Sequence, residues 1–125
     1  MTAILRRRLG TAGEGHARRY LEARGLIAIE ANWRCRAGEL DLVMRDGDEL
    51  VFVEVKTRTG DGMGTAEESV SSAQARSLLR AGALYIAHHP EVGDPVWRID
   101  LVAITLDRTG AVSRVSHEIN AIGDW

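Results

Sequence analysis

The chain has 125 residues, of which 45% are apolar, and this is enough for one globular domain with a modest core. Its formal net charge of −2 is unlike that of a general nucleic-acid coat protein, although arginine clusters can still form local basic patches. No apolar run approaches the length of a membrane-spanning helix, and the only cysteine, Cys35, excludes an internal disulfide. We therefore expect a single domain over residues 1–125 and no membrane association.

A basic segment opens the chain. Residues 1–10 contain three consecutive arginines but lack the apolar core of a signal peptide, so we expect a cytoplasmic protein with a flexible basic arm. Thr11 and Glu14 then have the spacing of a capping box, and Gly25 is placed to end the helix that this box would open. Residues 26–33 predict the first strand.

Two adjacent strands contain the most informative residues. Residues 38–44 and 49–56 both alternate in polarity, which predicts a hairpin with one apolar face. The other face gathers three carboxylates and the only lysine of the chain, namely Glu39, Asp41, Glu54 and Lys56.

The turn between these strands determines how close the charged groups lie. With Asp46-Gly47 as a two-residue loop, Asp41 would lie opposite Phe52. Asp41 and Glu54 would then be diagonal neighbours on one face, with Cα atoms roughly 7–8 Å apart. Two interpretations remain open. The face is an ordinary solvated surface, or a hard cation such as Mg²⁺ or Mn²⁺ relieves the repulsion between its carboxylates.

The second half of the chain predicts an α/β arrangement. A glycine-rich stretch at 59–64 predicts a mobile loop, and Ser71 with Gln74 predicts a second capping box for a helix that ends near residues 88–90. Strands are expected at 96–106 and, shorter, at 112–119. A helix that connects two strands of one sheet places them parallel, so we expect a layered α/β domain.

Three segments carry a resemblance to a known family. GEGHARRYLEARG, NWRCRAGELDLV and LVFVEVKTR resemble the small bacterial proteins of the YraN family, which is similar to the PD-(D/E)XK nucleases, including archaeal Holliday-junction resolvases. The resemblance covers most of the chain from about Gly13 onward. It implies a restriction-endonuclease-like three-layer α/β/α domain, with the order helix, three strands, helix, two strands and a central mixed sheet.

The same resemblance implies roles for the charged residues. Asp41 and Glu54 match the two acids that bind Mg²⁺ or Mn²⁺, with the carbonyl of Val55 as a third ligand. Lys56 matches the lysine that orients the attacking water or stabilises charge on the phosphate. Glu14 matches a helix glutamate that reaches the metal directly or through water, and its alternative role is the third position of the capping box.

The second helix and the arginines complete the implied site. Gln74 matches a catalytic glutamine, although we favour its simpler role in the capping box. Ala73 replaces a lysine that many family members have, and residues 62–64 lack their arginine and aromatic residue, so phosphate binding is expected to be weaker. Candidate contacts to backbone phosphates are Arg58, Arg36, Arg34 and Arg76.

The function implied by the resemblance is hydrolysis of DNA phosphodiester bonds by a Mg²⁺-dependent endonuclease. The substrate would be DNA rather than RNA, with branched or junction DNA in repair or recombination as candidates. A four-way junction would call for a homodimer, because each copy cuts one strand. The alternatives are a catalytically weak or inactive nucleic-acid-binding module of the same fold, and an interaction domain whose acidic patch binds no ion.

Overall fold

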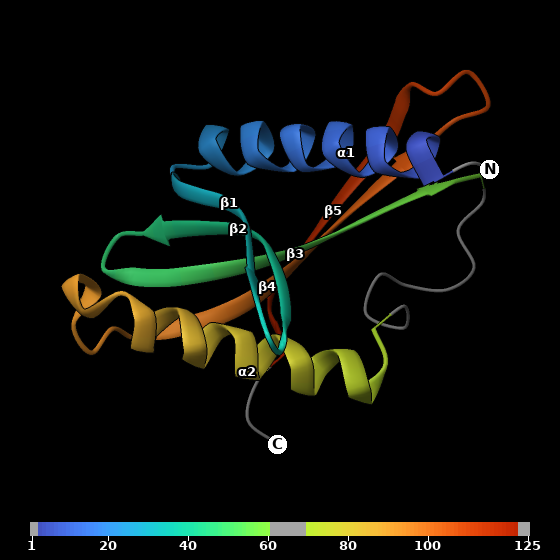
Figure 1. The fold of residues 1–125 in the computed structure, drawn as a ribbon. Coiled ribbons are helices and arrows are strands. Elements are labelled where there is room, and N and C mark those ends of the chain that lie inside the picture. Colours follow the sequence, from blue (N-terminus) through green and yellow to red (C-terminus); the bar gives the residue numbers. More distant parts are fainter. Residues whose placement is uncertain (1–2, 61–69, 123–125) are drawn as a thin grey trace.

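The computed structural model describes residues 3–60 and 70–122, with the side chains of α1 described from residue 12. A single five-stranded sheet lies between two helices, one on each face (Figure 1). The elements are α1 (Ala3–Ala23), β1 (Ile27–Cys35), β2 (Gly38–Asp46), β3 (Glu49–Thr59), α2 (Ser72–His88), a short 3₁₀ helix (Pro90–Val92), β4 (Trp97–Leu106) and β5 (Val112–Ile122). The predicted three-layer α/β/α architecture and the predicted order of elements are confirmed.

The sheet is mixed, as expected, and its strands lie in chain order from β1 to β5. Strands β1, β2 and β3 form an antiparallel meander, and α2 then crosses over so that β4 lies parallel to β3. Strand β5 returns antiparallel to β4 and forms the far edge. Among the described residues, no helix is both long enough and apolar enough to cross a membrane.

The two predicted capping boxes have different outcomes. At α2, the Gln74 amide donates to Ser71 Oγ at 3.1 Å and the Ser71 amide donates to Gln74 Oε1 at 3.4 Å, so this box is confirmed. At α1, the box at Thr11 and Glu14 is wrong, because the helix already begins at Ala3 and both residues lie inside it. Residues 3–10, expected to be a flexible arm, are therefore helical. The predicted end of the helix at Gly25 is confirmed by its left-handed backbone (φ 96°).

The hairpin register differs from the predicted one. Asp46 pairs with Glu49 and Leu42 with Val53, so the loop is Gly47-Asp48 rather than Asp46-Gly47. Gly47 has φ 61°, which suits the first loop position of a type II′ turn, a turn that needs no positive φ at its second position. The register therefore shifts by two residues, which preserves the face of each side chain. Continued one step, this pairing would place Asp41 directly opposite Glu54 rather than diagonal to it.

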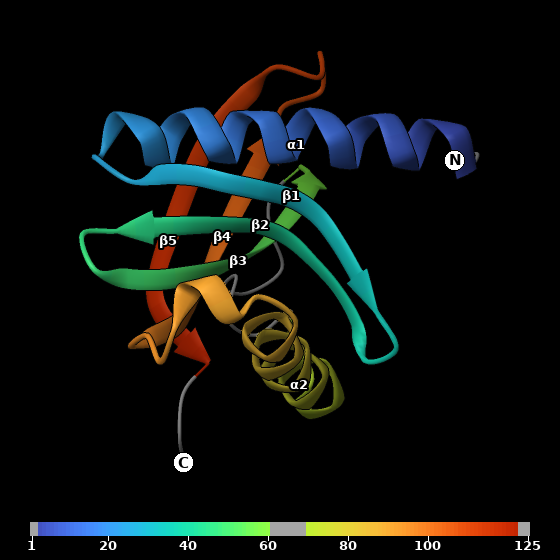
Figure 2. The same ribbon diagram turned by 60° about the vertical axis from the view of Figure 1, so that its left-hand side comes forward.

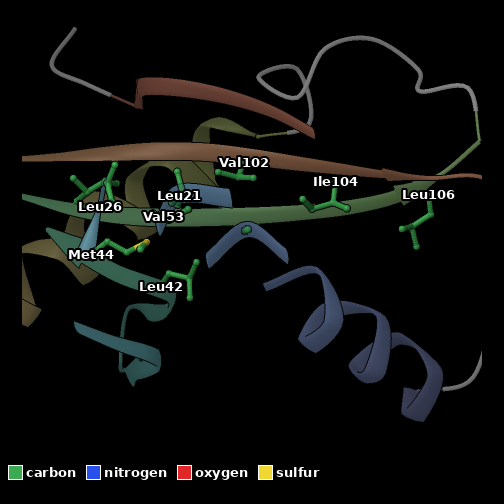
Figure 3. Packing of buried hydrophobic residues seen from close by; sticks show 10 residues of the cluster. Leu21, Leu26, Leu42, Met44, Val53, Val102, Ile104 and Leu106 are labelled. Atoms are coloured by element: carbon green, nitrogen blue, oxygen red, sulfur yellow. The ribbon is translucent and has the colours of Figure 1, made fainter. Parts of the chain in front are cut away.

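Each face of the sheet has its own apolar core. Beneath α1, Leu21 packs with β-strand residues such as Leu42, Val53 and Val102 (Figure 3). Beneath α2, Val43 and Phe52 are fully buried. Because these two residues lie on the hairpin face that was expected to be charged, that face is apolar at its centre, and its acids gather at the end where β2 leaves β3.

Most strands are longer than predicted, although β4 matches the prediction to within one residue. Strand β3 extends to Thr59, and the last strand is not short but runs eleven residues to Ile122. The predicted mobile loop at 59–64 lies, beyond Gly60, outside the described residues.

Candidate metal and phosphodiester site

Asp41 lies at the point where two strands separate. The backbone pairing of β2 with β3 ends at Leu42 and Val53, while β1 and β2 stay paired to their hairpin end. Figure 2 shows this β1–β2 hairpin bending away from β3. The Asp41 carboxylate replaces the backbone pairing that ends here, because its Oδ2 accepts a 2.8 Å hydrogen bond from the Val55 amide. One oxygen thus fixes the carboxylate against β3, and Oδ1 accepts no hydrogen bond from the described part of the chain.

Glu54 and Lys56 lie two residues apart on β3 and so project to the same side. Lys56 Nζ is 3.6 Å from Glu54 Oε1, and the side chains are 26% and 14% exposed. The ammonium is therefore partly withdrawn from solvent and held next to the carboxylate, as the alternation of the strand predicts. The Lys56 ammonium is thus a positive charge close to the carboxylates of both Asp41 and Glu54.

Glu14 reaches the same place from α1 because the helix approaches β3 very closely. Gly13 lies against Thr57, and a Cβ atom at position 13 would collide with the Thr57 hydroxyl. The side chain of Asn32 hydrogen-bonds to Glu14, and Asn32 itself has a left-handed backbone (φ 55°). The sequence prediction missed Asn32, although asparagine is one of the few residues other than glycine that adopt this conformation readily.

Glu14, Asp41 and Glu54, hereafter the acid group, all have raised pKa values, and Asp41 contributes to the rise in the other two. Burial raises the pKa of Glu54 to about 7, repulsion from Asp41 adds to it, and Lys56 opposes it. Burial also raises the pKa of Asp41 to about 6, although the hydrogen bond from Val55 lowers it. For Glu14, burial followed by repulsion from Asp41 raises the pKa to about 7, and the bond to Asn32 lowers it. Near neutral pH the acid group is thus a crowded set of partly charged carboxylates.

The donor chemistry of the acid group fits a hard divalent cation. Carboxylate and carbonyl oxygens are the ligands of Mg²⁺ and Mn²⁺, and a cation would relieve the repulsion that raises these pKa values. Within residues 3–60 and 70–122, however, no three acidic, histidine or cysteine side chains are arranged to hold an ion by themselves. An ion at this site would therefore rely on Asp41 and Glu54, with backbone and water oxygens completing its coordination.

The remaining predicted residues have different surroundings. Gln74 is exposed and its side chain is used in the α2 capping box. Arg58 continues β3 beyond Lys56, and its buried Nε has no hydrogen-bond partner among the described residues. Arg34 lies 3.7 Å from Glu39, Arg36 is exposed in the turn between β1 and β2, and Arg76 is exposed on α2. Glu39 adds to the repulsion on all three members of the acid group, so it belongs to their surroundings.

The mixed sheet between two helices, with acids where β2 leaves β3, defines the restriction-endonuclease-like fold class. Residues 13–104 match a family described as uncharacterised protein family UPF0102, and the chain belongs to this family. It is 47% identical to a UPF0102 protein of Frankia alni over 87% of this chain and 89% of that one. It is also 43% identical to a UPF0102 protein of Pelotomaculum thermopropionicum, over 95% and 98%. The matched region includes the acid group and Lys56.

Proposed function

We propose that the protein is a Mg²⁺- or Mn²⁺-dependent endonuclease that hydrolyses DNA phosphodiester bonds in the cytoplasm, with branched or junction DNA as its substrate. The main support is the hydrogen bond from the Val55 amide that fixes Asp41 beside Glu54 and Lys56. Phosphodiester hydrolysis needs charge neutralisation on the phosphate and a nucleophilic water, and these are the groups that can supply both.

Each residue of the site has a defined part in this proposal. Asp41 and Glu54 would hold the ion together with the Val55 carbonyl, and Glu14 would reach it through a bound water. When bound, the ion supplies a Lewis acid for the phosphoryl oxygens and lowers the pKa of a bound water. Lys56 orients that water or stabilises the negative charge that develops on the phosphate.

Cleavage assays test this proposal directly. Purified protein is incubated with Mg²⁺ or Mn²⁺ and matched duplex, flapped and four-way-junction DNA. Wild type should cut, and Asp41→Asn, which keeps the shape of the side chain but removes its charge, should not. Glu22→Gln is the matched control, because this carboxylate lies on the exposed surface of α1 and should not affect cleavage. Cleavage by wild type no faster than by Asp41→Asn would contradict the proposal.

One observation favours a second candidate, a DNA-binding module without catalytic activity. Among the described residues no ready-made set of three metal-binding side chains exists, and Glu54 already has Lys56 as its partner. Such a module would bind junction DNA equally well as wild type and as Glu54→Gln, and neither protein would cut it. Cleavage that depends on Glu54 would contradict this second candidate.

A homodimer is part of the junction proposal, because one acid group per chain cuts one strand at a time. Strand β1 is an edge of the sheet, and its Ile27 and Ile29 are 54% and 46% exposed. These side chains offer apolar surface to a second copy. Light scattering of the protein with and without a four-way junction would measure the stoichiometry. One protein chain per junction at saturation would contradict the dimer.

A further inference from the structure

A second feature of the molecule is a pocket between the end of the β1–β2 hairpin and the C-terminal half of α2. Its volume is about 470 Å³, which is within the size range of small-molecule sites. A neighbouring hollow of about 490 Å³ shares Arg36 and Leu84 with it, so the two lie next to each other beside α2. Figure 2 shows the end of the β1–β2 hairpin lying beside α2. We name the first hollow the Trp33 pocket, lined by Trp33, Arg34, Arg36, Leu84, His88 and His89, with Cys35.

Aromatic rings form a rigid wall of the Trp33 pocket. The His89 ring stacks on Tyr85 with centroids 3.8 Å apart and planes 17° apart. The Trp33 ring meets Tyr85 edge-on at 5.2 Å and lies within about 6 Å of His88 and His89. Tyr85 is 1% exposed, and its hydroxyl donates to Glu30 at 3.2 Å. The buried Tyr85 ring thus anchors Trp33 and His89, which limits the rearrangement that a flat ligand would require.

Hydrogen bonds fix the two histidine rings of the pocket. His88 Nδ1 is 2.8 Å from the Leu84 carbonyl, and His89 Nδ1 is 2.7 Å from the Tyr85 carbonyl. A carbonyl can only accept, so each Nδ1 carries the proton and donates it. His89 Nε2 lies 3.8 Å from Glu30 Oε1, so both nitrogens of this ring face groups of the protein. The two imidazole rings are thus held beside Trp33, where they extend the flat surface that a base can contact.

The charge of the pocket favours phosphate. Arg34, Arg36 and Arg80 line the two hollows. The carboxylates nearest to the lining are Glu39, 3.7 Å from Arg34, and Glu30, 3.8 Å from His89, so a positive excess remains at Arg36 and Arg80. This local excess contrasts with the net charge of −2 of the whole chain. Guanidinium groups contact phosphate oxygens with paired hydrogen bonds. Aromatic rings next to guanidinium groups are the combination by which proteins hold unpaired nucleotides.

The pocket is connected to the acid group by a few residues of β2. Arg34 pairs with Glu39 across the hairpin, and Asp41 follows two residues later on the same strand. A strand rises about 3.3 Å per residue, so one nucleotide spans the interval between Arg34 and Asp41. A single DNA strand can therefore occupy the pocket and present its neighbouring phosphate to the acid group.

We propose that the Trp33 pocket binds one unpaired nucleotide of a DNA strand, with the base against the aromatic rings and the phosphate at Arg34 and Arg36. This inference rests on the proposed endonuclease function and specifies its substrate. The DNA that is cut has an unpaired strand at the branch, and the cleaved phosphate lies next to the nucleotide in the pocket. An uninterrupted duplex does not fill the pocket.

Binding in EDTA tests the pocket without any need for cleavage. The probes are a blunt duplex and the same duplex with a short unpaired strand, whose first unpaired position is 2-aminopurine. Wild type should bind the branched probe about tenfold more tightly than the blunt one, as expected for one stacked base, and should quench its fluorescence. The variant Arg34→Ala/Arg36→Ala should lose most of this preference. Both side chains are exposed, so the variant should fold normally.

Arg45→Ala is the matched control, since it removes an exposed arginine from the opposite end of the same hairpin. It should weaken the binding of both probes equally and leave the preference for the branched probe intact.

Equal binding of both probes by wild type would overturn the inference, and so would an equal loss of preference in Arg45→Ala. Displacement of the branched probe by free dAMP, at a dAMP concentration close to the Kd of the probe, would also overturn the inference. The pocket would then serve a free nucleotide. Cleavage of blunt and branched DNA at equal rates would contradict the pocket inference alone, whereas branch-specific binding without cleavage would contradict the nuclease alone.

Discussion

Glu54 shows how a single residue can lower the stability of the folded chain while serving a site. Its carboxyl group is 14% exposed and lies beside Asp41, so its pKa is raised to about 7. A carboxylate with a raised folded pKa binds protons more tightly in the folded state, so deprotonation favours unfolding. Above pH 7 the free protein therefore holds this charge at a cost in unfolding free energy, which a bound cation would offset.

We predict that Glu54→Gln stabilises the metal-free protein at pH 8. The amide keeps the size of the side chain but has no charge to bury beside Asp41, so the unfolding free energy should rise by about 1–3 kcal/mol. Urea unfolding in EDTA measures the change, and Glu22→Gln on the α1 surface provides the control. A Glu54→Gln protein that is less stable than wild type at pH 8 would show that the ion pair with Lys56 outweighs the burial of the charge.

Helix α1 shows how a close approach between two elements builds the site. Gly13 lies against Thr57 of β3, and this contact brings the next residue, Glu14, to Asp41. We predict that Gly13→Ala destabilises the protein by about 1–3 kcal/mol, because the added methyl group overlaps the Thr57 side chain. It should also reduce cleavage in proportion to the displacement of Glu14.

Thr57→Ala in the Gly13→Ala background is the matched test of that explanation. Removing the Thr57 hydroxyl and methyl groups makes space for the new Cβ, so the double variant should recover most of the stability lost by Gly13→Ala. Thermal unfolding of the two single variants and the double variant measures the coupling. Strictly additive losses would mean that the helix and strand are not in steric contact at this position.

The same two elements show which features the sequence could predict. The Ser71–Gln74 box could be predicted because both of its hydrogen bonds are local. The identical spacing of Thr11 and Glu14 predicted a helix start wrongly, because a local pattern does not reveal that the helix is already running from Ala3. The alternation of β2 and β3 placed Asp41 and Glu54 on one face correctly, but the turn type set the register. Asn32 and the Gly13–Thr57 contact depend on tertiary packing and could not be inferred from spacing.

On the scale of the whole molecule, a cluster of charged groups around the buried Asp100 joins strands β3, β4 and β5. Asp100 on β4 is fully buried and accepts hydrogen bonds from Arg98 at 2.9 Å, from His117 Nε2 at 2.8 Å and from the Asn120 amide at 2.9 Å. Arg98 also donates to Glu49 on β3 at 2.6 Å. Strands β3, β4 and β5 therefore share one network at the end of the sheet.

We predict that Asp100→Ala destabilises the protein by about 3–5 kcal/mol, since it leaves His117 Nε2 and the Asn120 amide without their acceptor and removes one of the carboxylates around Arg98. Urea unfolding measures the loss. The comparison variant is Asp107→Ala, which removes an exposed carboxylate that bonds only within its own turn and should cost much less. Equal losses in the two variants would mean that the cluster contributes nothing beyond a local turn.

Asp100 and the acid group should together shape the pH dependence of the whole chain. Burial alone would raise the pKa of Asp100, but hydrogen bonds from His117, Arg98 and Asn120 outweigh it and lower that pKa. The stability that Asp100 contributes is therefore present above its unfolded pKa of about 3.9 and is lost as pH falls from there through the lower folded pKa. The acid group acts in the opposite direction, because its raised pKa values make stability fall as pH rises from about 4 to 7.

These opposing slopes predict a maximum of unfolding free energy in the weakly acidic range, near pH 4–5, for the metal-free protein. Mn²⁺ or Mg²⁺ should add stability above pH 7, where the acid group is deprotonated, and little at pH 5, where protons compete with the ion. The maximum should thus move towards neutral pH when metal is present.

Urea unfolding at several pH values, in EDTA and in excess metal, measures both curves of unfolding free energy against pH. Asp41→Asn should abolish the shift, because it removes the carboxylate that the Val55 amide fixes. Identical curves with and without metal would mean that the crowding of the acid group serves no ion.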